Sequence, residues 1–142
     1  RAVSAITHAH RISTESCVCF VTLLRGIISG EIIDIPTLGE AICKAKPIND
    51  SFAFLETVIS WPREEVCSGG FVLDTLGAAL WCFANTDTYA DCVLAAVNLG
   101  RDTDTTACVA GALAGAFYGI DAIPARWMDE LRGKDVIEAC LF

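Results

Sequence analysis

The chain has 142 residues, enough for one domain with a substantial hydrophobic core, and we expect residues 1–142 to form a single all-helical domain. Its formal net charge of −8, with no run of lysine or arginine, argues against binding to a nucleic-acid backbone. Apolar residues make up 54% of the chain and charged residues 20%, which predicts either an unusually buried interior or a surface that meets further protein.

Helical periodicity dominates the chain, and strand-like alternation never lasts for more than a few residues, so we predict an all-α fold. A first helix is predicted over residues 14–29, closed by Gly30. Its inward face is predicted to consist of apolar residues at helical spacing, namely Cys17, Phe20, Val21, Leu24, Ile27 and Ile28.

Two further helices are predicted in the first half of the chain. Pro36 favours the first turn of a short helix over residues 37–44. Asp50 or Ser51 can cap the next helix, which is expected to stop at Trp61 because proline follows it.

The second half alternates loops and helices. Residues 68–70 indicate a flexible loop, and residues 73–83 follow helical spacing. Asp87 is predicted to cap a helix that ends at Gly100, and an apolar helix is predicted over residues 105–118.

The end of the chain predicts two short helices. Pro124 opens the first, and Asp135 caps the second, which is expected to end near Leu141. The three tryptophans are expected to be core aromatics: Trp61, Trp81 and Trp127.

The eight cysteines do not form the pattern of a disulfide framework. Cys17 and Cys19 form a C-x-C pair without a second pair at zinc spacing, and several cysteines fall within apolar helical patterns. We therefore expect reduced thiols and a cytoplasmic location. The longest charge-free apolar run, residues 107–120, is shorter than the roughly 20 residues that cross a bilayer, so we expect no membrane partner.

Residues 102–106 place two carboxylates and three hydroxyls in five consecutive positions, directly before that apolar run. Such oxygen ligands suit a hard divalent cation. Asp102 and Asp104 are two residues apart, so a regular helix would point them about 200° apart, and they converge on one ion only from turn or extended backbone. The alternative is an ordinary helix N-cap.

Four segments, in this order, resemble the C-terminal half of the ADP-ribosylglycohydrolase family. They are residues 4–10, residues 68–76, residues 79–83 with 85–87, and residues 95–105 continuing into 110–116 and 118–119. The last segment, which contains Gly-Arg-Asp-Thr-Asp-Thr, is the most specific.

This resemblance implies a compact, orthogonal multi-helix bundle and a hydrolase that removes ADP-ribose from modified protein side chains. It also implies a two-metal centre, with Asp102, Asp104 and Thr105 providing one half of a shell for Mg²⁺ or Mn²⁺. No residue is assigned as a catalytic acid or base.

The resemblance implies that ADP-ribose or an ADP-ribosylated protein is the partner. His8 follows Thr7 in a segment that lines the family's cleft, and a neutral imidazole there can hydrogen-bond ribose or phosphate. Gly69, Gly70 and Phe71 match a loop that lies against the nucleotide. The structural alternatives are a histidine that satisfies loop backbone and a plain turn whose phenylalanine joins the core.

One departure from the family pattern limits these expectations. The acidic Thr-Asp-Asp-Thr-type segment of the family's N-terminal half does not occur in this chain, which opens on Arg1 without methionine. We therefore expect an excised piece, inactive by itself, that self-associates or packs on the missing half. A non-catalytic ADP-ribose or nucleotide-binding module and an oligomerising helical scaffold stay open as alternatives.

Overall fold

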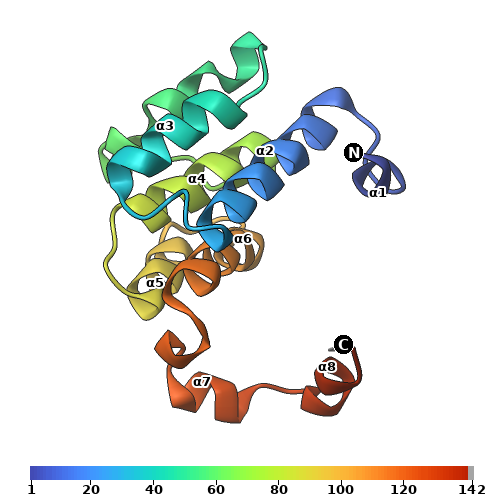
Figure 1. Cartoon of the computed structure of the whole chain (residues 1–142), viewed down its shortest axis with the longest axis vertical. Coiled ribbons are helices and arrows are strands. Elements are labelled where there is room, and N and C mark those ends of the chain that lie inside the picture. The colour runs from blue at the N-terminus through green and yellow to red at the C-terminus, as the bar shows by residue number, and fades with distance from the viewer. Residues whose placement is uncertain (141–142) are drawn as a thin grey trace.

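The computed structural model describes residues 1–140, which form helices joined by short loops and, over these residues, no β-strand (Figure 1). The α-helices are α1 (Ala2–Ala5), α2 (Arg11–Ile28), α3 (Ile35–Ala45), α4 (Val72–Ala84), α5 (Tyr89–Asn98), α6 (Thr103–Tyr118), α7 (Ala125–Glu130) and α8 (Lys134–Cys140). Short 3₁₀ segments are η1 (Asp50–Glu56), η2 (Val58–Ser60), η3 (Arg63–Glu65) and η4 (Ile120–Ala122). The predicted all-α class is confirmed.

Helix α4 forms the centre of the core and packs against α2, α5, α6 and η2. All but four of its 13 residues are buried, because it is apolar on every side. Gly77 allows η1 to approach closely, since a Cβ there would lie 2.6 Å from Cε2 of Phe54. The central helix is therefore covered on several faces at once.

The inward face predicted for α2 is only partly right. Ile27 is buried, but Val21 and Ile28 are 58% and 71% exposed. The fully buried apolar residues of α2 are instead Cys19 and Leu23. Helix α2 carries apolar residues on two faces, and periodicity alone does not say which of them the core covers.

Several helix ends differ from the predicted ones by a few residues. Helix α2 begins at Arg11 rather than residue 14, and α6 begins at Thr103 rather than residue 105. Helix α8 begins at Lys134, so Asp135 lies in its first turn and is not the cap. The predicted end near Leu141 lies outside the described residues.

Two predicted caps are also wrong. The segment after Asn49 is 3₁₀ rather than α-helical, and the Asn49 side chain accepts a hydrogen bond from the Ser51 N–H at 3.0 Å. Helix α5 is capped by Thr88 rather than Asp87, since the Thr88 hydroxyl accepts from the Asp91 N–H at 3.0 Å. Where several cap-forming residues are adjacent, the backbone path selects one of them.

The tryptophans are all partly exposed. Trp61 and Trp81 pack against the core, but Trp127 lies outside it, with its ring 6.1 Å from that of Tyr89. This contact attaches α7 to α5, and α7 and α8 extend away from the helical body (Figure 1).

All eight cysteines are free thiols in the structure. Burial raises the pKa of Cys19 and Cys92 to about 11 and that of Cys82 to about 12, so these three are unreactive core residues. Cys17 and Cys108 are exposed. Within residues 1–140, no helix is both long enough and apolar enough to cross a membrane.

Candidate functional site

Two loops that are distant in the sequence are joined beside the start of α6. The Ser68 hydroxyl is buried and donates a hydrogen bond to the Gly100 carbonyl at 2.9 Å. The Asp102 N–H donates to the Ser68 carbonyl at 3.0 Å. The predicted flexibility of residues 68–70 is therefore wrong at Ser68, because two hydrogen bonds fix this residue.

The turn before α6 has an uncommon backbone. Gly100 and Arg101 both have positive φ, at 87° and 59°. A left-handed conformation costs a non-glycine residue about 1–2 kcal/mol, and such residues concentrate at functional sites. This turn directs the chain from the end of α5 into Asp102.

Asp102 occupies the N-cap position of α6, but its side chain makes no capping hydrogen bond. Instead, its backbone carbonyl joins the first turn of the helix, accepting hydrogen bonds from the Thr106 N–H at 3.2 Å and from the Thr106 hydroxyl at 2.8 Å. Asp102 is thus at the N-cap position, as the alternative of an ordinary helix cap predicts, but its carboxylate does not cap the helix.

Asp104 lies in the first turn of α6, next to Asp102. Its Oδ1 accepts a hydrogen bond from the Thr105 N–H at 2.9 Å. This hydrogen bond, followed by hydrogen bonding with the Asp102 side chain, lowers the pKa of Asp104 below its usual range. An ionised carboxylate therefore stands beside Asp102, with Asp102 in turn backbone and Asp104 in the helix.

An open cavity of about 490 Å³ lies beside this turn, between the start of α2, the start of α4 and α6. Its lining includes four of the residues singled out from the sequence: His8, Gly70, Phe71 and Thr105. This volume lies within the range of about 300–1,000 Å³ that small-molecule sites occupy.

The two glycines of the loop approach carboxylates closely. A Cβ on Gly70 would lie 3.4 Å from Oδ2 of Asp102, so this carboxylate lies close to Gly70. Of the three predicted metal ligands, only Thr105 lines the cavity, and Asp102 and Asp104 do not. A Cβ on Gly69 would lie 2.8 Å from Oδ2 of Asp74. Gly69 does not line the cavity, so among the predicted glycines only Gly70 faces it.

Both histidines line the cavity, but their local contacts differ. His10 is the N-cap of α2, because its Nδ1 accepts from the Ile12 N–H at 3.3 Å, and this leaves the proton on Nε2. His8 is exposed, and its Nδ1 lies 3.0 Å from the Thr7 hydroxyl. The interpretation of histidine as a backbone partner therefore applies to His10.

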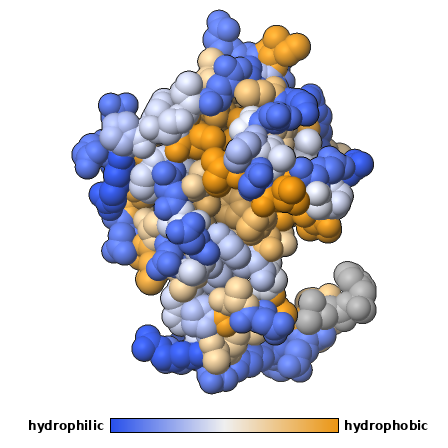
Figure 2. Space-filling view, turned by 60° about the vertical axis from the view of Figure 1, so that its left-hand side comes forward, coloured by the Kyte–Doolittle hydropathy of each residue, from blue (hydrophilic) through white to orange (hydrophobic). Residues whose placement is uncertain are grey.

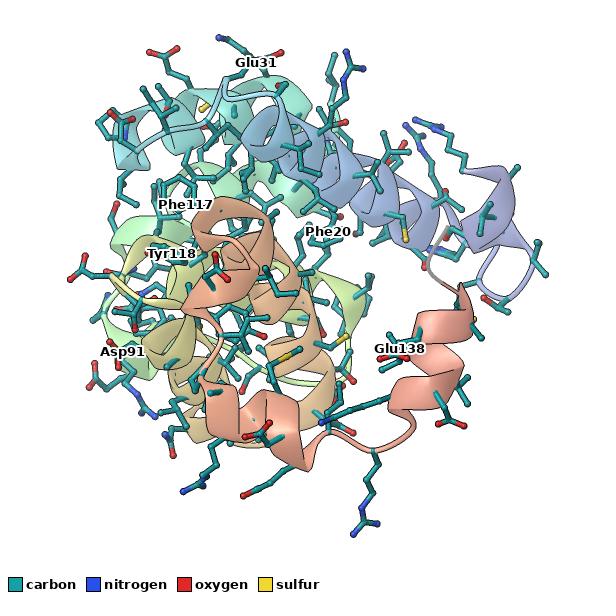
Figure 3. All side chains as sticks on the ribbon, turned by 60° about the horizontal axis from the view of Figure 1, so that its bottom comes forward. Phe20, Glu31, Asp91, Phe117, Tyr118 and Glu138 are labelled. Atoms are coloured by element: carbon teal, nitrogen blue, oxygen red, sulfur yellow. The ribbon has the colours of Figure 1, made fainter. Side chains whose placement is uncertain are left out.

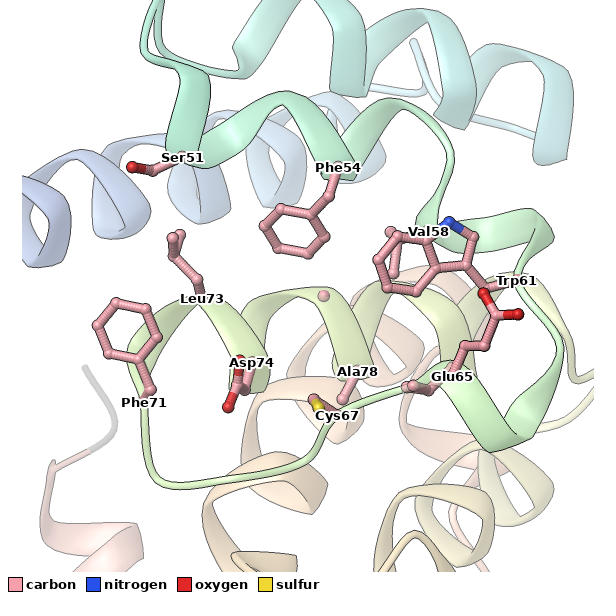
Figure 4. Close-up of a pocket in the computed structure, with 12 residues that line it drawn as sticks. Ser51, Phe54, Val58, Trp61, Glu65, Cys67, Phe71, Leu73, Asp74 and Ala78 are labelled. Atoms are coloured by element: carbon pink, nitrogen blue, oxygen red, sulfur yellow. The ribbon is translucent and has the colours of Figure 1, made fainter.

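Phe71 does not join the core. It is the N-cap residue of α4 and is 53% exposed. The Thr75 hydroxyl lies 3.4 Å from the Gly69 and Phe71 carbonyls, which holds the loop on the first turn of α4. Phe71 also lines a second cavity, which lies between the 3₁₀ segments and α4 (Figure 4).

Three hydroxyl residues hold the site together in a way that the sequence did not predict: Ser68, Thr75 and Thr106. Each is buried and each donates to a backbone carbonyl of the two loops. The only signal in the sequence was a hydroxyl residue next to a glycine or aspartate motif, which is too common to select them.

The oxygen donors fit part of a site for a hard cation. Asp102, Asp104 and Thr105 offer two carboxylates and a hydroxyl within one turn of backbone, and the carboxylate of Asp102 is free of capping. A hard cation takes about six oxygen ligands. Within residues 1–140 there is no cluster of three or more histidine, cysteine or acidic residues suited to a metal, so these donors provide an incomplete shell.

Comparison with known proteins gives a consistent result. Residues 1–141 match the family described as ADP-ribosylglycohydrolase. An ADP-ribosylarginine hydrolase, Tri1, from Serratia proteamaculans is 49% identical over 69 residues, which cover 49% of this chain and 19% of that protein. An ADP-ribosyl-[dinitrogen reductase] glycohydrolase from Rhodospirillum rubrum is 30% identical over 133 residues, covering 94% of this chain and 42% of that protein.

A solved structure described as an ADP-ribosylglycohydrolase-related protein complex has the same fold. It superposes with a TM-score of 0.79 at 32% identity, over 96% of this chain and 47% of that chain. In each of these comparisons the matched part spans less than half of the known protein.

Proposed function

The chain belongs to the ADP-ribosylglycohydrolase family, and on this basis we propose that it provides the C-terminal half of a hydrolase that removes ADP-ribose from modified protein side chains. The observation that carries the proposal is the cavity of about 490 Å³, where His8, Gly70, Phe71 and Thr105 meet from three separate parts of the chain.

The cavity residues suit the parts of ADP-ribose. Phe71 is half-exposed and offers an aromatic face to a ring of the nucleotide. Gly70, which has no side chain, allows a ligand to approach the backbone beside Asp102. The exposed imidazole of His8 can donate a hydrogen bond to a phosphate or ribose oxygen, or accept one from a ribose hydroxyl.

Asp102, Asp104 and Thr105 are proposed as ligands of Mg²⁺ or Mn²⁺. When bound, such a cation supplies Lewis-acid chemistry beside the glycosidic bond. The lowered pKa of Asp104 keeps its carboxylate ionised to a lower pH than an ordinary aspartate, so it stays available as a ligand. Cleavage of a glycosidic bond passes through an oxocarbenium-like state, which nearby carboxylates stabilise.

The remaining ligands are proposed to come from an acidic polypeptide segment outside these residues. A groove of about 200 Å³ between α2, α4 and α6 offers a place for it, lined by Cys17, Phe20, Val21 and other residues that are almost all apolar. Val109 lines both this groove and the larger cavity, so a segment in the groove would lie beside Thr105. Figure 2 shows further hydrophobic patches on one face of the molecule.

By itself the chain is therefore proposed to bind metal weakly and to lack hydrolase activity. The same exposed apolar surface favours self-association unless the missing half of the family fold covers it. We propose a cytoplasmic location, which reduced thiols would support.

The test is hydrolysis of ADP-ribosyl-arginine, measured as released ADP-ribose. The chain is assayed alone and joined behind the N-terminal segment of a longer family member. We expect activity only in the joined protein, with Asp104→Asn abolishing it. Asp87→Asn is the matched control, because Asp87 lies in a similar Asn-Thr-Asp-Thr sequence away from the cavity, and it should keep full activity. A joined protein that folds and keeps its rate with Asp104→Asn would contradict the proposal.

The second candidate is a non-catalytic ADP-ribose-binding module. It is favoured by the cavity being formed although the metal ligands are incomplete. Calorimetry on the chain with ADP-ribose and Mg²⁺, together with the hydrolysis assay, distinguishes the two candidates. A binding module binds ADP-ribose while the joined protein stays inactive, whereas a hydrolase half gives an active joined protein. Light scattering tests the oligomerising scaffold, for which a monomer at all concentrations is the contrary result.

A further inference from the structure

A second cavity of about 320 Å³ lies between the 3₁₀ segments and α4 and shares Phe71 with the first cavity (Figure 4). We call it the aromatic cavity. Its lining combines three aromatic rings, several aliphatic side chains and two carboxylates, the residues of interest being Phe54, Trp61, Glu65, Phe71 and Asp74. It lies near the lower end of ligand-site volumes, about 300 Å³, so it suits a side chain better than a nucleotide.

The aromatic wall of this cavity is held in place. The Trp61 indole N–H donates to the Thr57 hydroxyl at 3.1 Å, and the Trp61 carbonyl accepts from the Trp81 indole at 2.8 Å. The ring of Phe54 lies 5.9 Å from that of Trp61 and fits over Gly77, where a Cβ would clash with it. The wall is therefore formed before any ligand arrives.

The two carboxylates of the cavity have no cationic partner within residues 1–140, where the ion pairs involve other acidic residues. Asp74 lies in the first turn of α4, which stabilises a negative charge. Glu65 has no such helix, since it ends the three-residue segment η3, and nearby Arg63 donates to the Asn98 carbonyl instead. Glu65 is therefore the carboxylate more open to an added cation.

Aromatic faces and an unpaired carboxylate together select a cation with an apolar stem. A guanidinium is planar, stacks on an aromatic ring and hydrogen-bonds a carboxylate at the same time, whereas an ammonium is a compact, strongly hydrated charge. The net charge of −8 attracts either cation to the surface.

We propose that the aromatic cavity binds an unmodified arginine side chain of a polypeptide, with its guanidinium between the indole of Trp61 and the carboxylate of Glu65. Figure 4 shows Trp61 and Glu65 toward one end of the cavity and Phe71 and Asp74 toward the other. Phe71 also lines the cavity proposed for ADP-ribose, so, given that function, the bound arginine belongs to the protein substrate close to its modified residue.

The test compares two probes that differ in charge but hardly in shape, Nα-acetyl-arginine amide and Nα-acetyl-citrulline amide, by calorimetry on the whole chain without metal or ADP-ribose. We expect the arginine probe to bind at least roughly tenfold more tightly than citrulline, because only it pairs with a carboxylate. Equal affinities, or no heat with arginine at tens of millimolar, would overturn the proposal.

Variants and NMR locate the binding. Glu65→Gln should weaken arginine binding roughly fivefold or more. Glu64→Gln, its exposed neighbour outside the cavity, should change it by less than about twofold. The Trp61 indole N–H signal should shift most, and that of Trp127 should not move. A Glu65→Gln variant with wild-type affinity, or a shift centred on Trp127, would refute the site.

The outcome is separable from that of the hydrolase proposal. Arginine binding that depends on Glu65, together with an inactive joined protein, would keep the cavity and reject the hydrolase. An active joined protein whose chain shows no preference for arginine over citrulline would do the reverse.

Discussion

The cavity beside α6 has two walls that are built differently. One consists of the loop at Ser68 and the turn at Gly100, joined by a buried hydrogen bond between residues 32 positions apart. The other contains His8 and His10, whose side-chain hydrogen bonds reach only one or two residues along the chain. Long-range bonds fix the first wall relative to the core, whereas local bonds orient the histidines only relative to their own segment.

We infer from this difference that the two walls have different roles in binding a ligand. The wall formed by the Ser68 loop and the Gly100 turn is fixed by these long-range bonds, as a metal or nucleotide site requires. We expect the histidine wall, held only by local bonds, to adjust more readily when a ligand arrives. The predictions below test whether the two walls differ in energy as they differ in construction.

The largest effect is expected from Ser68→Ala. It leaves the Gly100 carbonyl without its buried donor, which costs about 1–3 kcal/mol of unfolding free energy. Urea denaturation measures this cost. Thr7→Ala, which removes an exposed hydroxyl from the histidine wall, should change stability by less than about 0.5 kcal/mol. Equal effects would show that the walls do not differ.

Gly100→Ala should come next, with a loss of about 1–2 kcal/mol, because φ at Gly100 is +87°. Gly115→Ala in α6 is the matched control. A Cβ there would meet Tyr89 at an ordinary 3.6 Å, and a helical alanine gains up to about 1 kcal/mol over glycine. In thermal unfolding, Gly100→Ala should lower the midpoint temperature and Gly115→Ala should raise it. Two decreases of the same size would contradict the role of the turn.

His10→Ala should cost about 0.5–1 kcal/mol through loss of the α2 cap. In the double variant His10→Ala/Ser68→Ala, the two losses of stability should add, since the hydrogen bonds of Ser68 and His10 do not join the two walls to each other. A coupling energy well above about 0.5 kcal/mol in the double-mutant cycle would show that the walls act as one unit.

The smallest effect is the pH dependence of Asp104. Its pKa is lowered in the folded state, so its ionisation adds stability above the unfolded pKa, about 3.9, and this contribution is lost as pH falls through the lower, folded value. Carboxyl NMR titration should place Asp104 below its usual range. Asp34, whose pKa the Thr37 side chain lowers, is the positive control. An Asp104 that titrates at or above its ordinary value would contradict the stabilisation of its carboxylate by the Thr105 N–H.

Much of the fold could be predicted from local patterns. Proline, glycine and apolar spacing placed most helices within a few residues, because helix starts and ends depend on neighbouring residues. The caps at Asn49 and Thr88 were missed where several cap-forming residues are adjacent. The covered face of α2 was missed because both of its faces are apolar.

The functional site shows the same limit: features that depend on neighbouring residues could be predicted, and those that depend on distant segments could not. Four lining residues of the cavity, His8, Gly70, Phe71 and Thr105, were singled out through the family resemblance. Gly69, by contrast, lies close to Asp74 and not at the cavity, and Ser68 was taken for part of a flexible loop. No local pattern says that the Ser68 hydroxyl meets the Gly100 carbonyl.

The sequence by itself thus determined the helices and the chemistry available near residue 102, since both depend on residues within a turn or two of each other. The tertiary structure decided which face of α2 is buried, which glycine meets the cavity and how Ser68 joins the two loops. These depend on how segments distant along the chain pack, and packing is a property of all the helices together.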